Sequence, residues 1–501
     1  MATAALRPRD RDFLTRIAAA VTANPFGEER AAIDREISSA PADVPRAEVL
    51  GRMLAVLDQR LGSIAGGRPD LGRFPPEDRE RLELALLFQV FHRIAPDLDL
   101  RIETELAGDR GPVKFAREAL AELAARGIGD DAARHYLAVF WQMRRAFYFV
   151  ETSLPGTSTS MRRLRQSLWN AVFTHDLLLY SRLLWRRMED FSTFLVGETG
   201  TGKGTAAAAI GRSGLIPFDA RRQRFESSFV DMFLSVNLSE FPETLLESEL
   251  FGHEKGSFTG ATDRHEGVLA RTRTHGAIFL DEIGEVAPAV QVKLLNVLQD
   301  RSFRPVGTHD AKRFEGRVIS ATNRPVDELR RAGAFRDDLW YRLSADVIEM
   351  PTLRRRLEED PSELGLLIET ILTAMLGEKP PEVVAMVEAA IARDLPAGYR
   401  WPGNVRELAQ CVRRVLLTKR YVPELPRDAG GDEGHALLEA TERGALRGDA
   451  LLARYCAALY DELGTYEAVA ERVGIDRRTA KKHVVAARRG GGHPEGARGG
   501  A

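Results

Sequence analysis

Residues 194–205, FLVGETGTGKGT, constrain the fold of this chain more than any other stretch. A short apolar run ends in Gly197, and after four residues Gly202 and Lys203 precede a run of alanines. This order of strand, glycine-rich loop and helix start is typical of a phosphate-binding loop. Glycines let successive N–H groups point at one anion, and the new helix turns its positive end toward it. The pattern therefore predicts a nucleotide site in which Lys203 reaches the outer phosphates.

We expect every residue of this loop to contact the nucleotide: Gly197, Glu198, Thr199, Gly200, Thr201, Gly202, Lys203, Gly204 and Thr205. A generic loop of this kind has Ser or Thr directly after the lysine, where its hydroxyl binds Mg²⁺. Here Gly204 occupies that position and Thr205 follows it. A glycine-rich turn with an incidental lysine is the alternative, which the complete spacing disfavours.

Two adjacent carboxylates follow a second apolar run, in residues 277–285, AIFLDEIGE. The run predicts a buried strand with Asp281 and Glu282 at its carboxyl end, where ligands bind in open α/β sheets. Paired carboxylates are costly there unless a cation or a proton-transfer role stabilises them. We assign Asp281 to Mg²⁺ and Glu282 to the attacking water. A strand-ending acidic turn is the alternative.

Polar residues also follow the apolar run 318–321, among them Asn323, which suits sensing of the γ-phosphate. An Asn that caps a turn is the competing interpretation. Residues 335–343, FRDDLWYRL, predict a helix that carries Arg336 and Arg342. Arginines can stabilise phosphoryl transfer from the same or a neighbouring molecule, and surface salt bridges explain these two equally well.

The length of 501 residues predicts about three domains. Apolar spacing of three and four residues predicts helices throughout the first 150 residues and again after position 351. In the later helical region we interpret the basic run 354–356 as a solvated face. Asn404 is a plausible N-cap for a helix that carries Arg406. The expected domains are 1–152 (helical, regulatory), 153–352 (α/β ATPase), 353–422 (helical lid), 423–454 (linker), 455–489 (DNA-binding) and 490–501 (tail).

The end of the chain predicts a helix-turn-helix. Residues 455–463 and 466–473 have helical spacing, Gly474 makes the turn, and a third helix extends to about residue 487. The third helix carries the residues expected to contact DNA: Arg477, Arg478, Thr479, Lys481 and Lys482. The net charge of the chain is −2, so nucleic-acid binding must depend on such a local patch. A three-helix unit with a solvated basic face is the alternative.

Composition points to the cytoplasm. No apolar run is long enough to span a bilayer, and the first residues, MATAALRPRDRD, lack the core of a signal peptide. The two cysteines, Cys411 and Cys456, lie far apart without metal-ligand spacing around them. A reducing cytoplasmic compartment and no association with membranes are therefore expected.

Together these motifs resemble the bacterial enhancer-binding proteins, which are AAA+ activators of sigma-54 RNA polymerase. The most specific stretch is 247–261, ESELFGHEKGSFTGA, because GSFTGA corresponds to the GAFTGA loop with which that family contacts sigma-54. The resemblance implies sigma-54 contacts at Gly256, Ser257, Phe258, Thr259, Gly260 and Ala261. It also implies that Asn237 pairs with Glu282, that Asn323 and Arg406 act as sensors, and that Arg336 and Arg342 act on the neighbouring subunit's nucleotide. The family has Glu where this chain has Gly204.

The fold class implied is α/β: a three-layer P-loop AAA+ domain with a helical lid, between an all-α N-terminal domain and a Fis-type helix-turn-helix. The resemblance implies a hexameric ring that hydrolyses ATP with Mg²⁺ and remodels the sigma-54 RNA polymerase holoenzyme while bound to upstream double-stranded DNA. Two alternatives remain, namely an AAA+ remodelling ATPase independent of sigma-54 and a DNA-binding regulator in which the ATPase module is only an oligomerisation switch.

Overall fold

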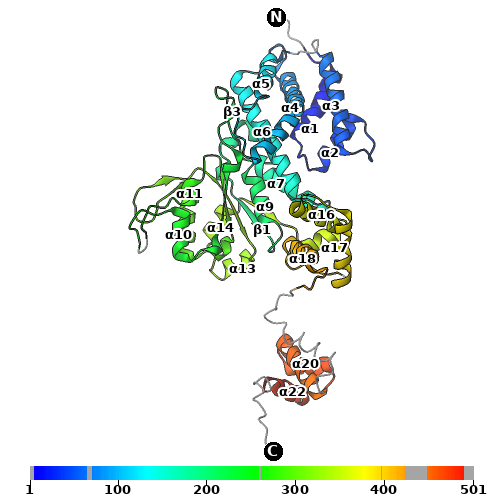
Figure 1. Cartoon of the computed structure of the whole chain (residues 1–501), viewed down its shortest axis with the longest axis vertical. Helices are drawn as coiled ribbons and strands as arrows, with labels where there is room; N and C mark the ends of the chain where they lie inside the picture. Colours follow the sequence, from blue (N-terminus) through cyan, green and yellow to red (C-terminus); the bar gives the residue numbers. More distant parts are fainter. Residues whose placement is uncertain (1–4, 65–69, 259–260, 397, 424–447, 490–501) are drawn as a thin grey trace, which may run out of the picture. The chain divides into compact units, whose positions relative to one another are not determined.

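The computed structural model divides the chain into two units, Met1–Tyr421 and Val422–Ala501 (Figure 1). It describes residues 5–64, 70–258, 261–396, 398–423 and 448–489. Thr259 and Gly260 of the expected sigma-54 loop, most of the expected linker and the tail 490–501 lie outside the described residues.

A parallel sheet of five strands in the order β4-β5-β8-β1-β9 organises the first unit. The strands are β1 (Thr193–Val196), β4 (Phe233–Asn237), β5 (Ala277–Asp281), β8 (Arg317–Thr322) and β9 (Asp346–Glu349). Two short antiparallel pairs lie outside it, β2 (Phe218–Asp219) with β3 (Arg224–Phe225) and β6 (Ser302–Phe303) with β7 (Lys312–Arg313). Because parallel strands end at one edge, the residues after β1, β5 and β8 converge there.

Alternating side chains of the sheet enter two different cores, because successive residues of a strand point to opposite faces. On β5, Phe279 packs into one core and Ile278 into the other. The first core contains α9 (Lys203–Gly211), and the second contains α10 (Glu243–Phe251), α12 (Pro288–Asp300) and α14 (Asp337–Leu343). Two more helices contribute to the second core, α11 (Val268–Arg271) and α13 (Val326–Arg331). This arrangement confirms the predicted three-layer α/β architecture.

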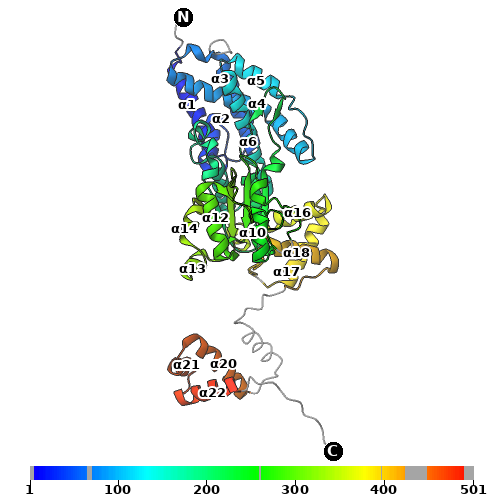
Figure 2. The same ribbon diagram turned by 90° about the vertical axis from the view of Figure 1, so that its left-hand side faces the viewer.

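Helices make up the described N-terminal region and share the core on the α9 face of the sheet (Figure 2). They are α1 (Pro8–Thr22), α2 (Glu28–Ser38), α3 (Arg46–Ser63), α4 (Pro76–Leu106), α5 (Ala116–Ala125), α6 (Asp130–Ser153), α7 (Thr159–Phe173) and α8 (Leu177–Arg182). Arg145 of α6 is fully buried and donates to the carbonyl oxygens of Arg212, after α9, and Gly214. Burial lowers the pKa of its guanidinium to about 9. The helical region is thus packed directly on the sheet domain.

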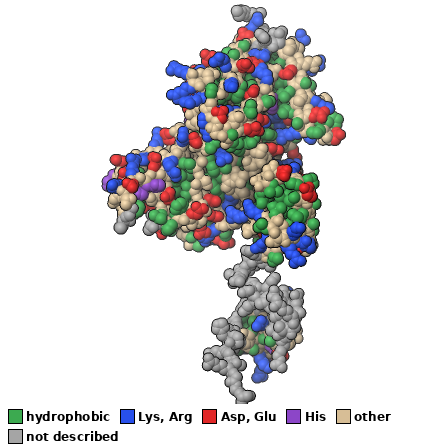
Figure 3. All heavy atoms as spheres, in the orientation of Figure 1, with side chains coloured by type: hydrophobic (Ala, Val, Ile, Leu, Met, Phe, Trp, Pro, Cys, Tyr) green, Lys and Arg blue, Asp and Glu red, His purple; other side chains and the backbone are tan. Residues whose placement is uncertain are grey.

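A helical subdomain with its own core completes the first unit. It consists of α15 (Leu353–Glu359), α16 (Glu363–Leu376), α17 (Pro381–Asp394) and α18 (Asn404–Thr418), and apolar side chains gather on the face seen in Figure 3. Our interpretation of 354–356 as a solvated face is wrong for Arg356. That side chain is buried and forms an ion pair of 2.6 Å with Glu363, which is itself fully buried. Tertiary packing of α15 on α7 and α16 removes this one member of the basic run from solvent.

The described residues of the second unit form three helices, α20 (Gly448–Leu463), α21 (Tyr466–Val473) and α22 (Arg477–Arg489). Cys456, Val469, Ala480 and Val484 form its core. Gly474 has a φ of +74°, the left-handed conformation that ends α21 and starts the turn. Helix α20 begins inside the range 423–454 that we interpreted as a linker. Among the described residues, none of the helices has the length and apolar character needed to cross a bilayer.

Candidate nucleotide and partner-contact sites

The loop between β1 and α9 surrounds the ammonium group of Lys203. Its Nζ donates to the carbonyl oxygen of Gly197 at 2.8 Å and to that of Glu198 at 3.3 Å. Burial lowers the pKa of Lys203, while the nearby carboxylates of Glu282 and Asp281 act in the opposite direction. The lysine therefore lies at the start of α9 as the motif predicts.

A cavity of about 500 Å³ opens beside this loop. Its polar wall brings together the loop residues 199–205, the carboxylates Asp281 and Glu282, and Arg406 of α18. Its apolar wall comes from the end of α6, the start of α7 and the helical subdomain: Leu154, Pro155, Met161, Leu367, Ile371 and Val405. A volume in the range of small-molecule sites, with an anion-attracting and an apolar side, suits a nucleotide.

The two carboxylates lie at the carboxyl end of β5. Glu282 has a φ of +55°, a conformation that non-glycine residues adopt rarely and mostly at functional sites. Its backbone N–H donates to the Asp281 carboxylate at 3.0 Å, and burial raises the pKa of the Asp281 carboxyl group.

Asn323, after β8, links Glu282 to the glycine-rich loop. Its N–H donates to Glu282 at 3.2 Å and its side-chain amide donates to the Thr199 hydroxyl at 3.0 Å.

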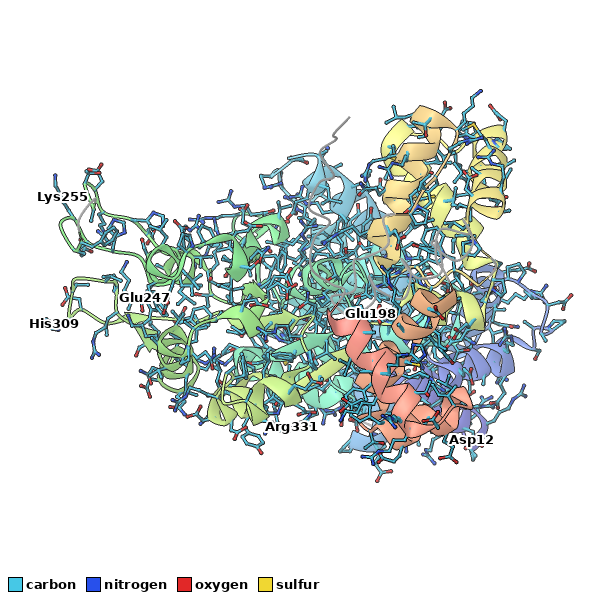
Figure 4. All side chains as sticks on the ribbon, turned by 90° about the horizontal axis from the view of Figure 1, so that it is seen from below. Asp12, Glu198, Glu247, Lys255, His309 and Arg331 are labelled. Carbon is cyan, nitrogen blue, oxygen red and sulfur yellow. The ribbon has the colours of Figure 1, made fainter. Side chains whose placement is uncertain are left out.

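The phosphate loop is attached to the helical subdomain by Glu198 (labelled in Figure 4) and Asn404. Glu198 accepts from Arg354 at 2.7 Å and from the Asn404 amide at 3.1 Å. The Asn404 amide also donates to the carbonyl oxygen of Thr199 at 3.0 Å, and its own carbonyl accepts from the N–H of Leu353. Our N-cap prediction is therefore wrong, because Gly403 occupies the cap position of α18 and Asn404 is fully buried.

Glycine is required at position 200 by the same junction. Gly200 has a φ of +80°, and a Cβ atom there would lie 2.2 Å from the carbonyl oxygen of Gly403. Val405, the second residue of α18, donates its N–H to the Gly200 carbonyl at 3.1 Å. At Gly204, by contrast, a Cβ atom would meet only the Phe279 ring at 3.8 Å. The loop thus touches the subdomain at Gly200 and is open at Gly204.

Of the residues predicted for the nucleotide site, six do not line the cavity formed by the described residues: Gly197, Glu198, Asn237, Asn323, Arg336 and Arg342. Arg336 precedes α14 rather than lying on it, and its Nε and Nη2 donate to the Asp338 carboxylate at 3.0 and 2.7 Å. Arg342 is exposed on α14. Asn237 ends β4 in register with Asp281, but its side-chain amide donates to Glu240 at 3.1 Å and not to Glu282.

The expected sigma-54 loop lies at the far end of a projection from the second face of the sheet. Figure 4 shows Lys255 and His309 together at this end, away from Glu198. Gly256 has a φ of +80° and donates its N–H to Ala261, while Phe258 is 38% exposed. The Ser257 hydroxyl donates to the carbonyl oxygens of Glu254 and Val306, the latter at 2.8 Å. The Ser257 hydroxyl thus joins the loop to the segment that contains Val306.

The third helix of the second unit presents its basic side chains at the surface. Asp476 accepts from the N–H groups of Arg478 and Thr479, each at 3.0 Å, and so caps α22. Arg477 pairs with Glu467, and the Lys481 ammonium lies 5.8 Å from the centre of the Tyr466 ring. Within the described part of the chain, Arg478 and Lys482 have no ion pair. These two cations are free to bind an external anion.

Sequence reasoning missed the side chains that join the segments around the cavity, above all Arg354, Arg356 and Glu363. Glu363 accepts from the N–H groups of Thr157 and Ser158, at 2.7 and 2.6 Å, and thereby holds the segment before α7 against the subdomain. No local signal marks these residues, because each acts through a partner far away in the sequence.

Comparison with known proteins identifies the sheet domain. Residues 180–349 match the family described as the sigma-54 interaction domain. This segment is a sigma-54 interaction domain. The match confirms the resemblance inferred from the GSFTGA loop, and the sheet with its helical subdomain is the expected AAA+ fold.

Several curated proteins resemble part of this chain. The Nif-specific regulatory protein of Azotobacter vinelandii is 36% identical over 278 residues, which cover 54% of this chain and 46% of that protein. The transcriptional regulatory protein ZraR of Klebsiella oxytoca is 38% identical over 304 residues, covering 58% and 62%. The chain therefore spans less than two thirds of these relatives. A crystal structure of NtrX from Brucella abortus is 25% identical, covers 74% of this chain and 80% of its own, and has a TM-score of 0.39.

Proposed function

We propose that this protein is an ATP-hydrolysing activator of sigma-54 RNA polymerase. The observation that carries the proposal is the GSFTGA stretch, which lies inside the sigma-54 interaction domain with Phe258 partly exposed on a projecting loop. An exposed aromatic ring between glycines suits a probe that presses on a partner rather than a piece of core. Residues 256–261, which include Thr259, are the proposed sigma-54 contact.

ATP is the proposed substrate, and the residues of the cavity fit it. Lys203 and Arg406 bring positive charge to the phosphates, the loop and α9 offer backbone N–H groups, and the apolar wall suits the base. The described residues hold no cluster of three or more metal-ligating side chains, so Mg²⁺ would be bound by Asp281 together with the phosphates. When bound, it would neutralise charge developing on the phosphates. Glu282 would orient and deprotonate the attacking water, and Asn323 would hold Glu282 and Thr199 in place.

We further propose that the active form is a hexameric ring. Arg336 and Arg342 lie at the surface outside the chain's own cavity, which suits arginines supplied to the nucleotide of a neighbouring subunit. Arg336 would leave Asp338 to do so. Asn237 ends the strand next to Asp281 and remains a candidate link between the nucleotide and the loop.

We propose roles for the remaining regions from the same resemblance to sigma-54 activators. Residues 1–152 would regulate the ATPase, 153–352 and 353–422 would form its two parts, and 423–454 would connect them to a DNA-binding domain at 455–489. Arg477, Arg478, Thr479, Lys481 and Lys482 would contact upstream double-stranded DNA, with Arg478 and Lys482 as phosphate contacts. The proposed location is the cytoplasm.

Open-complex formation on a sigma-54 promoter tests the proposal. The variants Phe258→Ala and Thr259→Ala are expected to keep ATP turnover within about threefold of the natural chain and to abolish open complexes. Lys203→Ala is expected to lose ATP binding and both activities. Capture of sigma-54 with a transition-state analogue of ATP provides the direct measurement of contact. If the loop variants still form open complexes, or sigma-54 is not captured, a sigma-54-independent ATPase is the better assignment.

A further inference from the structure

A second cavity, of about 170 Å³, lies among the N-terminal helices, apart from the nucleotide site. Helices α1 to α4 and α6 to α8 contribute to it, several of which lie side by side in Figure 2. Aromatic and aliphatic side chains dominate its wall, in particular Leu84, Phe88, Phe91, Phe140, Phe147 and Trp169. Folded cores pack with few voids larger than a water molecule, so a cavity of this size within a helical region requires an explanation.

The volume sets the size of an occupant. An engineered apolar cavity of about 150 Å³ in another protein binds benzene, whereas sites for drug-sized ligands span about 300–1,000 Å³. At about 170 Å³ the cavity matches a single six-membered ring with a small substituent.

The polar groups of the wall determine the substituent. Arg30 is paired with Asp34 at 2.7 Å, and Arg144 is paired with Asp99 through two bonds of 2.5 Å. Arg46 differs, because it donates only to the carbonyl oxygen of Pro25 and lies over the Phe147 ring. Of the carboxylates that the structure describes, none forms an ion pair with Arg46, which is exposed at the edge of the cavity. The carboxylates of Asp34 and Glu151 act on the charge of Arg46 from a distance, so the wall carries one guanidinium without a direct carboxylate partner.

His92 adds an unsatisfied hydrogen-bonding group. Its Nε2 is buried without a partner among the described residues, and its ring packs edge-on against Phe88 and Phe91. Burial, together with the charges of Arg30 and Arg144, lowers the pKa of His92 to about 3, so the ring is neutral near pH 7. Buried polar atoms are nearly always paired, and one without a partner on a cavity wall points to an absent ligand.

We propose that this cavity binds a small aromatic carboxylate, with the ring between the phenylalanines, the carboxylate at Arg46 and one hydrogen bond at His92. An aromatic ring fits the edge and face contacts of the wall. A carboxylate compensates the unpaired guanidinium, with which it can form two parallel bonds. The site would be a sensor of aromatic acids in the N-terminal region.

Helix α7 provides a route from this site to the nucleotide. Trp169 near its end lines the aromatic cavity, and Met161 near its start lines the nucleotide cavity. The Asn24 side chain, after α1, donates to the backbone of Gln166 and to Asn170, which ties the cavity wall to α7. A ligand that shifts α7 would therefore alter ATP turnover, an expectation that rests on the proposed ATPase function.

Ligand-observed fluorine NMR with the full chain tests the site without reference to ATP. The probes are 4-fluorobenzoate and 4-fluorophenylacetate, with 4-fluorobenzyl alcohol as the neutral comparison. At least one carboxylate is expected to bind with a Kd below about 1 mM, and the alcohol about tenfold more weakly. If neither carboxylate binds, or the alcohol binds as tightly, the assignment is wrong.

Matched variants locate the binding. Leu84→Trp fills the cavity and is expected to abolish binding, whereas Leu100→Trp, at an exposed position of the same helix, is expected to leave it unchanged. Arg46→Gln is expected to remove the preference for the carboxylate. Arg52→Gln, which breaks only an exposed pair with Glu48 on the same helix, is its control. Circular dichroism verifies folding, and equal binding by Leu84→Trp and Leu100→Trp would overturn the site.

The coupling is measured separately, as ATP turnover with and without the bound carboxylate. A change of at least twofold that Leu84→Trp eliminates is expected. Binding with unchanged turnover overturns the coupling through α7 and leaves the site, and turnover that is absent under all conditions refutes the proposed ATPase instead.

Discussion

The buried Glu363 carboxylate connects the helical subdomain to the segment before α7. It pairs with Arg356 at 2.6 Å and accepts two backbone N–H groups from residues 157 and 158, while Arg356 also donates to the Pro155 carbonyl. Glu363→Gln keeps the size of the side chain, so no void forms. It leaves the Arg356 charge buried without a counter-ion, and loss of one partner of a buried pair costs about 3–5 kcal/mol.

Hydrogen exchange of the full chain, followed by mass spectrometry, is the appropriate measurement, because a unit of this size need not unfold in one step. A loss of about 3 kcal/mol raises the local exchange rate by roughly 100-fold or more in residues 155–160 and in α16. Glu369→Gln, which breaks an exposed pair with Lys379, is the control and is expected to change exchange by less than about fivefold. The reasoning is refuted if Glu363→Gln and Glu369→Gln give the same exchange in these segments.

Three further predictions concern the glycine-rich loop after β1, the N-terminal helices and the C-terminal unit that is proposed to bind DNA. Gly200→Ala is expected to raise the KM for ATP at least about tenfold, because its Cβ clashes with Gly403, whereas Gly204→Ala stays within about twofold in the same assay. The pKa of His92 is lowered to about 3, so the unfolded chain binds the extra proton as pH falls from 6.5 toward 3, and stability declines over this window. Between pH 7 and 5 the loss is about 2 kcal/mol, and exchange in α4 of His92→Phe should lack this part of the pH dependence. Arg478→Ala is expected to weaken DNA binding similarly for all sequences and to reduce the salt dependence by about one ion, measured by fluorescence anisotropy between 50 and 200 mM salt.

The nucleotide site was predictable because its residues belong to contiguous motifs. The spacing from Gly197 to Lys203 specifies a loop and a helix start, and Asp281 and Glu282 follow a short apolar run that is typical of a buried strand. Parallel strands then bring both segments to the same edge without further information. The GSFTGA stretch is equally local, which is why it indicated the sigma-54 interaction domain before any coordinates.

Other features could not be read from local patterns. Asn404 follows a Pro-Gly turn and has the sequence context of an N-cap, yet its side chain binds Glu198 and Leu353, which are far away in the chain. Arg356 is one of three consecutive arginines that the sequence does not distinguish from one another. It is buried only because α15 packs on α7 and α16. The aromatic residues of the N-terminal helices have core-like spacing whether they fill a core or line a cavity.

The sequence by itself therefore determined which chemical groups this protein offers: a glycine-rich loop with a lysine, two adjacent carboxylates, the GSFTGA stretch and a basic helix. The tertiary structure alone decided how these parts are joined, through Glu198 and Asn404 at the phosphate loop, Glu363 at the segment before α7, and a continuous core between the N-terminal helices and the sheet. The physical reason is that motif spacing reflects short-range backbone geometry. Burial and pairing of a charge depend on which distant segment packs against it.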